Sequence, residues 1–278
     1  MSLQSNNSVT AFSMQCKKLW ENWRKGASGT VRITNRQNTI RSGIKMVTGF
    51  MAPLNIVFVD LGGDCGSFSW SNWRLKIDKG YIKRANIKYK DFLELCCTAY
   101  HETRHAEQFY RIAQGLACEK ISFPDKSKAQ MIQEVRRTGS SVRDKIALYE
   151  GRSLHANTRS SREMIAKWLS IPSNVAGTAV TAKMGFVGYI QLGKPRWFKR
   201  KTAKLEVEEW MRSTYKKTLG EVNEWAQSDA GPYKIYRDQA EEHDAHEIEK
   251  VLKAKLIQTI GLAYQANKNK RQSELVTS

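Results

Sequence analysis

The chain has 278 residues, and its 46 Lys and Arg outnumber its 27 Asp and Glu to give a formal net charge of +19. A hydrophobic content of 41% with 8 tryptophans excludes a disordered polypeptide and predicts a folded protein with a substantial core. No stretch stays apolar over the roughly 18 residues that a membrane-spanning helix needs, so no transmembrane span is expected.

The positive charge is spread along the chain and is densest at residues 194–204. Trp197 and Phe198 stand there among lysines and arginines, a composition that suits contact with nucleic acid or with an anionic polymer or lipid surface. A solvated basic turn that keeps the protein soluble explains the same residues. The sequence carries no motif of a nucleic-acid-binding fold.

The first predicted element is an amphipathic helix at residues 11–25, within an N-terminal helical segment at 1–30. Residues 1–10 are polar and rich in Ser and Asn, and they lack the charged start and the apolar run of a signal peptide. We therefore expect a protein that is made without a cleaved leader.

Short strands and turns are predicted over residues 30–88. Residues 55–60 and 73–77 have the composition of strands, and the glycine-rich turn at 62–66 separates them. The next predicted element is a helix at about 91–116, with apolar residues at three- and four-residue steps and Gly115 near its end. A strand beside this helix would offer a sheet edge that can bind an extended peptide.

This predicted helix carries the sequence His101-Glu102-Thr103-Arg104-His105. Histidines four residues apart in a helix lie one turn apart on the same face, so both rings can reach a single metal ion. The glutamate between them can then accept a proton from a water on that ion, as catalytic zinc sites require. A core helix with two incidental histidines is the alternative. The helical setting favours a zinc site with His101 and His105 as ligands and Glu102 as the general base.

Further helices are predicted at residues 127–149, 160–169, 202–226 and 237–266. Residues 172–193 are instead rich in small and apolar residues and carry a single charge, Lys183. A buried helical pair that closes over the site is favoured for this segment over a hairpin that inserts into a membrane.

The predicted organisation is one domain at residues 31–267, followed by a flexible tail at 268–278. Within that domain, we expect the sheet and the motif helix at 31–120, a helical insertion at 121–230, and the helix of a third metal ligand at 231–267.

The cysteines are odd in number and show no Cys-x-x-Cys spacing, which indicates a reducing compartment during synthesis. Cys97 lies one turn before His101 and could approach a metal, although packing in the core is the favoured interpretation. The five cysteines are Cys16, Cys65, Cys96, Cys97 and Cys118.

A third zinc ligand has to come from another part of the chain, because catalytic zinc usually has three protein ligands. The segment Glu242-His243-Asp244-Ala245 matches a Glu-x-x-Ala pattern. Together with the His-Glu-x-x-His motif it resembles the zincin metallopeptidases of the gluzincin type, in which a glutamate on a later helix completes the site. The resemblance implies one Zn²⁺ ion with Glu242 as its third ligand. The competing candidates for this ligand are Glu241, His243, His246, Glu119 and Glu134.

The same resemblance implies an α+β, predominantly helical fold. It would consist of a zincin-like core, with a short sheet beside the motif helix, and a helical insertion. Tyr236 and His246 are candidates to stabilise an oxyanion, since both stand near Glu242 in the sequence.

The longer run from His101 to Gln108 further resembles the His-Glu-x-x-His-x-x-Gln of metallopeptidase-like domains in bacterial toxins and contractile-injection effectors. This resemblance implies a protein made in a bacterial cytoplasm and delivered to another cell, where it cleaves a target-cell protein. The implied partners are that substrate, a delivery apparatus and an immunity protein.

Two other classes of function stay open. The charge of +19 would suit a nucleic-acid-associated protease. A basic membrane-active or structural protein could instead use zinc only to hold its fold. The peptidase is favoured because a purely structural zinc site has no need of a general base such as Glu102.

Overall fold

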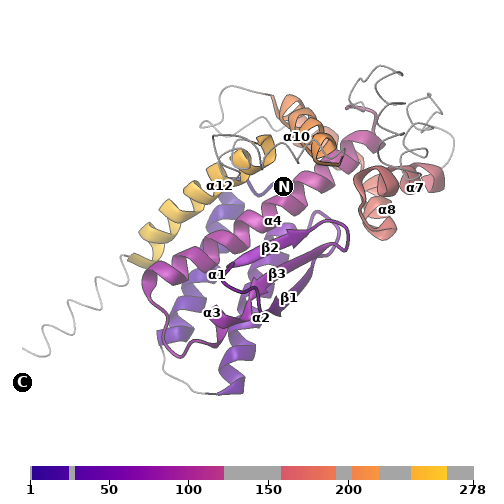
Figure 1. Ribbon diagram of the computed structural model, residues 1–278. Helices are drawn as coiled ribbons and strands as arrows, with labels where there is room; N and C mark the ends of the chain where they lie inside the picture. Colours follow the sequence, from indigo (N-terminus) through magenta and orange to yellow (C-terminus); the bar gives the residue numbers. More distant parts are fainter. Residues whose placement is uncertain (1, 25–28, 122–157, 192–201, 219–238, 262–278) are drawn as a thin grey trace, which may run out of the picture. The chain divides into compact units, whose positions relative to one another are not determined.

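The computed structural model describes residues 2–24, 29–121, 158–191, 202–218 and 239–261 (Figure 1). These residues are predominantly helical and include a three-stranded sheet, which confirms the coarse fold class. The described helices are α1 (Asn6–Arg24), α2 (Thr30–Thr48), α3 (Lys79–Lys83), α4 (Tyr89–Ala117), α7 (Thr158–Leu169), α8 (Ser173–Thr181), α9 (Met184–Gln191), α10 (Ala203–Thr218), α12 (Ala240–Leu256) and the π-helix η3 (Ile257–Gly261), and the strands are β1 (Asn55–Val59), β2 (Gly66–Ser69) and β3 (Arg74–Asp78).

The chain forms two compact units. Unit 1 contains residues 1–68, 74–104 and 246–278, and unit 2 contains residues 69–73 and 105–245. The helices α4 and α12 contribute to both units, because each crosses a boundary between them. The predicted single domain at 31–267 and its subdivisions stay predictions.

In unit 1, α1 and α2 pack against each other. The buried residues Phe12, Cys16, Leu19 and Trp23 recur along α1 at three- and four-residue steps, as an amphipathic helix requires. Helix α1 begins at Asn6, earlier than the predicted residue 11. Gly43 of α2 lets the helices approach closely, since a Cβ there would stand 3.2 Å from the Cβ of Gln15.

The prediction of strands and turns throughout residues 30–88 is wrong for residues 30–48, which form α2. This segment is rich in Thr, Ile and Val, residues that favour strands when they are judged alone. The apolar residues Ile40, Ile44 and Val47 nevertheless recur with helical spacing and are buried, so tertiary packing decides for the helix.

The sheet of unit 1 has the strand order β1-β3-β2. Strands β1 and β3 are parallel, with Asn55 opposite Arg74 and Val59 opposite Asp78, and both were predicted. The short strand β2 was not predicted, because its four residues Gly-Ser-Phe-Ser look like the end of the preceding glycine-rich turn. Positive φ angles of 64° at Gly62 and 123° at Gly63 confirm that turn.

Helix α4 confirms the predicted motif helix and extends it slightly at both ends. Gly115 lies inside the helix, two residues before its end. A Cβ there would stand 2.8 Å from Cδ1 of Ile121, so glycine leaves room for that side chain. In unit 2, the residues of α4 that follow the motif bond to the pair α8 and α9. Tyr110 Oη donates to the carbonyl of Thr178 at 3.3 Å, and Gln114 Nε2 donates to the carbonyl of Ala182 at 2.7 Å.

The small-residue segment at 172–193 forms the helices α8 and α9 within residues 173–191, which confirms the predicted pair of helices. Its closure over the site stays a prediction. Val175, Ala176, Ala179 and Phe186 are buried, so these helices contribute to the core of unit 2. Among the described residues, no helix has both the length and the apolarity to cross a membrane. Helices α7 and α10 confirm the predictions at 160–169 and for the first part of 202–226, whereas the predicted helix at 127–149 and the basic residues 194–201 lie outside the described residues.

Candidate metal centre

Helix α4 places His101 and His105 on successive turns, as predicted, and buries both. Their residues are only 7% and 8% exposed, while Thr103 and Arg104 between them are fully buried. Glu102 is partly exposed. The helix therefore keeps the two imidazoles in a dry environment and leaves the carboxylate between them accessible to water, which is the division that a ligand pair and a general base need.

Gly66, the first residue of β2, lies directly against this turn of α4. A Cβ at Gly66 would stand 3.0 Å from Cγ2 of Thr98 and 3.7 Å from Cγ of Glu102. A Cβ would force these neighbours to shift, so glycine favours the close approach of the strand to the helix. The start of β2 is therefore a neighbour of the predicted general base.

In unit 2, each ring nitrogen of His105 has a polar neighbour. Its Nε2 lies 3.2 Å from Oε2 of Glu242, and its Nδ1 lies 2.9 Å from Oε1 of Gln108. Gln108 Nε2 donates to the carbonyl of Glu241 and to Oδ2 of Asp244, each at 2.8 Å. Because the amide nitrogen of Gln108 is used as a donor, its oxygen accepts a hydrogen bond from Nδ1–H of His105. The lone pair of His105 is then on Nε2, which faces Glu242.

Three carboxylates are buried in the first turns of α12. Glu241, Glu242 and Asp244 are 3%, 3% and 5% exposed. The positive end of the helix dipole stabilises anions at this place. A bound cation would stabilise them further, since several buried negative charges in close proximity are costly.

In unit 1, His101 is accompanied by two residues from the later part of α12. His101 Nδ1 lies 3.4 Å from Oε2 of Glu249, and His246 Nδ1 lies 3.1 Å from the same oxygen. The rings of His101 and His246 have their centres 4.6 Å apart. The hydrogen bond from His101 lowers the pKa of Glu249 below its ordinary value, and the interaction with His246 acts in the same direction.

The described residues contain two groups whose ligand atoms could hold a metal ion. One group consists of His101, His105 and Glu242, and the other of His101, His246 and Glu249; within each group these atoms lie within 4.8 Å of one another. Each group offers two imidazole nitrogens and one carboxylate oxygen. This donor set fits zinc and other divalent transition metals better than magnesium or calcium, which prefer oxygen ligands.

The structure thus groups the predicted ligands His101, His105 and Glu242, and Glu102, between the two histidines on α4, is partly exposed. Among the competing third ligands, Glu241 is buried but belongs to neither group, and His243 and Glu119 are exposed. His246 belongs to the second group rather than the first. Glu134 and the oxyanion candidate Tyr236 lie outside the described residues.

Sequence reasoning missed Glu249 and the role of Gln108. Glu249 follows His246 by three residues and Glu242 by seven, so the three share one face of a helix. That spacing was a usable signal. Gln108 appeared only as part of a motif, and its contact with Asp244 joins residues 136 positions apart.

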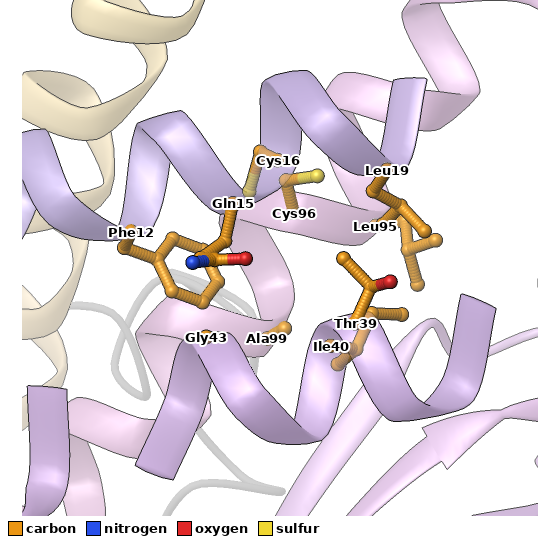
Figure 2. Close-up of a pocket in the computed structure, with 10 residues that line it drawn as sticks. All are labelled: Phe12, Gln15, Cys16, Leu19, Thr39, Ile40, Gly43, Leu95, Cys96 and Ala99. Carbon is orange, nitrogen blue, oxygen red and sulfur yellow. The ribbon is translucent and has the colours of Figure 1, made fainter. Parts of the chain in front are cut away.

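No cysteine belongs to a metal group found among the described residues, and Cys16, Cys96 and Cys97 are buried in the core. An apolar pocket of unit 1 is lined by Cys16 of α1 and Cys96 of α4, which Figure 2 shows side by side. Burial raises the pKa of the Cys96 and Cys97 thiols, and it raises the pKa of Cys65 to about 12. The raised pKa favours the protonated thiols in the metal-free protein. Neither metal group found among the described residues includes Cys97, in line with the favoured packing role.

Comparison of the chain with protein-family models, with curated proteins and with solved structures finds no match.

Proposed function

We propose that this protein is a zinc-dependent metallopeptidase with a zincin-like core, in which His101, His105 and Glu242 hold the ion and Glu102 is the general base. The observation that carries the proposal is the orientation of His105. Gln108 occupies its Nδ1 at 2.9 Å, so its Nε2 faces Glu242 at 3.2 Å with a lone pair available for a cation. His101, one turn earlier on the same unbroken helix, completes the group.

In the proposed hydrolysis, Glu102, Gln108 and Glu249 have different roles. Zinc, when bound, would lower the pKa of a coordinated water and polarise the carbonyl of the peptide bond. The carboxylate of Glu102 accepts a proton from the attacking water and passes it to the nitrogen of the leaving amine. Gln108 and Glu249 orient the two imidazoles through their Nδ1 atoms, as second ligand shells commonly do.

A peptide substrate in extended conformation suits the surroundings of Glu102. Strand β2 is at one edge of the described sheet, and a Cβ added at its first residue, Gly66, would lie 3.7 Å from Cγ of Glu102. A sheet edge can pair with an extended peptide through main-chain hydrogen bonds. The expected substrates are therefore unstructured segments of proteins.

The proposal extends to delivery of the protein from a bacterial cell into another cell, where it acts as a toxin or effector on a target-cell protein. This part is supported by the resemblance of the run from His101 to Gln108 to such proteins. The structure gives Gln108 a physical role in that run, since it fixes the ring of His105.

The test is to compare the purified full chain with its Glu102→Gln variant. Both are loaded with zinc and incubated with a peptide library whose products are identified by mass spectrometry. We expect unchanged zinc content and a loss of cleavage rate of about 10²- to 10⁴-fold in the variant, the usual contribution of a general base. Glu94→Gln, at an exposed position of α4, is the matched control and should retain the wild-type rate.

Equal cleavage by Glu102→Gln and wild type would contradict the role of Glu102. Absence of cleavage by the zinc-loaded wild type, with zinc needed for stability, would favour a structural zinc site. Cleavage that appears only when DNA is added would favour the nucleic-acid-associated protease.

A further inference from the structure

We propose that His101, His246 and Glu249 form a second position for a divalent transition-metal ion, which is occupied in alternation with the position at His101, His105 and Glu242. The three residues lie within unit 1, so their arrangement does not depend on unit 2. The proposal concerns metal binding and does not require peptidase activity.

The donor atoms of the second position lie close to one another. The Oε2 atom of Glu249 lies 3.4 Å from Nδ1 of His101 and 3.1 Å from Nδ1 of His246. The two imidazole rings are 4.6 Å apart between centres. Small movements of the side chains would bring all three donor atoms to the roughly 2.0–2.2 Å at which zinc binds nitrogen and oxygen.

The second position is also more open than the first. The side chains of His246 and Glu249 are 24% and 30% exposed, whereas those of His105 and Glu242 are 10% and 4% exposed. A hydrated ion can therefore reach His246 and Glu249 before it loses its water shell. The buried pair at the first position can bind an ion only after most of that water has left.

His101 makes the two positions alternatives. A neutral imidazole has one lone pair, so it binds one ion at a time. At the second position the ion would be bound through Nδ1 of His101, the atom nearest Glu249. At the first position Nδ1–H of His101 would face Glu249, and Nε2 would be the atom that holds the ion. Movement of the ion therefore requires the ring proton of His101 to change nitrogen, and each chain binds about one ion at saturation.

The test separates the positions by double variants of the full chain. His105→Ala with Glu242→Gln removes two ligands of the first position, and His246→Ala with Glu249→Gln removes two ligands of the second. The control, His243→Ala with Glu247→Gln, changes the same residue types at exposed or solvent-facing places on α12. Zinc content after equilibrium dialysis is measured by inductively coupled plasma mass spectrometry, and the visible spectrum of bound Co²⁺ reports the ligand set.

We expect about one ion per chain in the wild type, in the control and in each double variant, and a different Co²⁺ spectrum for each of the two double variants. In the variant with all four substitutions, the affinity for the ion should fall more than about 100-fold below that of the wild type. Where the first double variant fails to fold, the isosteric Glu242→Gln is used alone. It should retain its ion, and it should lose that ion when His246→Ala is added.

Loss of the ion from the variant of His105 and Glu242 overturns this inference and leaves the proposed function intact. Retention of the ion by both double variants supports alternating occupation. Retention by the variant of His105 and Glu242, with loss from the variant of His246 and Glu249, overturns the alternation, because only the second position then holds an ion. An ion that depends only on His246 and Glu249 would contradict the proposed function, because that function requires His105 and Glu242 as ligands. The two proposals are therefore contradicted by different results.

Discussion

The two histidines of α4 are oriented by different chemistry, although they stand one turn apart. His105 bonds to a buried neutral amide, Gln108, which is 1% exposed and is itself fixed by two bonds to α12. His101 faces a carboxylate, Glu249, which is 30% exposed and is shared with His246. The difference indicates that the imidazole of His105 is rigidly held, whereas His101 has a charged and partly solvated neighbour.

Among the variants that test this difference between His101 and His105, Gln108→Leu is expected to have the largest effect on zinc affinity and stability. The substitution removes the acceptor of His105 Nδ1–H and leaves the polar groups of α12 that Gln108 satisfies without that donor. We expect zinc affinity to fall by about 10- to 100-fold. The free energy of unfolding of the metal-free protein should fall by about 1–3 kcal/mol. Competition with a chromophoric chelator and urea unfolding measure these two effects.

Gln114→Leu is the matched control for that experiment. Gln114 is equally buried on α4, but it donates to the carbonyl of Ala182 and has no bond to a histidine. It should cost stability without lowering zinc affinity. Equal losses of affinity in both variants would show that general damage to the helix, rather than orientation of His105, is responsible.

A second large effect is expected from Gly66→Ala, which tests the surroundings of Glu102. The new Cβ would stand 3.1 Å from the carbonyl oxygen of Lys76, a backbone atom that cannot move freely. We expect a loss of about 1–3 kcal/mol in the free energy of unfolding, as in other overpacked sites, and slower cleavage with unchanged zinc content. Gly188→Ala, at a place with open space, is the control. A Gly66→Ala protein of wild-type stability would contradict the close approach of β2 to α4.

A smaller effect is expected from Glu249→Gln, which sharpens the contrast between the two histidines. The amide can still accept a bond from His101, but it lacks the charge of the carboxylate. Zinc affinity should therefore fall by about 10-fold, near the lower end of the range for residues that orient a ligand. Isothermal titration of the metal-free protein measures this change. A loss as large as that of Gln108→Leu would remove the distinction between a rigid and an adjustable histidine.

The smallest effect concerns the pH dependence of stability in the metal-free protein. The pKa of Glu249 is lowered in the folded protein by His101 and His246. Its carboxylate therefore stabilises the fold above the unfolded pKa of about 4.3, and this contribution is lost as the pH falls through the lowered value. The difference between wild type and Glu249→Gln should be less than about 1 kcal/mol near neutral pH and should vanish in acid. Urea unfolding at several pH values measures it, and a difference that grows in acid would contradict the sign.

The local parts of the site could be predicted from the sequence. The helix around His101 and His105 follows from apolar spacing, and their common face follows from a separation of four residues. Glu242 could be proposed from a resemblance alone. Its contact with His105 depends on the packing of two helices that are far apart in the sequence, and no local pattern determines that packing.

The features that the sequence did not predict also depend on packing between distant parts of the chain. Helix α2 has strand-favouring residues and forms as a helix because it packs on α1, with Gly43 against Gln15. Strand β2 has only four residues and becomes a strand by pairing within the sheet. The spacing of Glu249 indicates that it shares a face of α12 with His246, but its proximity to His101 depends on packing that no local pattern determines.

Metal content of the His101→Ala variant tests the central claim most directly, because His101 belongs to both candidate groups. Zinc-loaded wild type, His101→Ala and the exposed control His243→Ala are dialysed together and analysed by inductively coupled plasma mass spectrometry. We predict about one zinc ion per chain in the wild type and in the control, and none in His101→Ala. Equal zinc in His101→Ala and wild type, or no zinc in any of the three, would contradict a metal centre on α4 and α12.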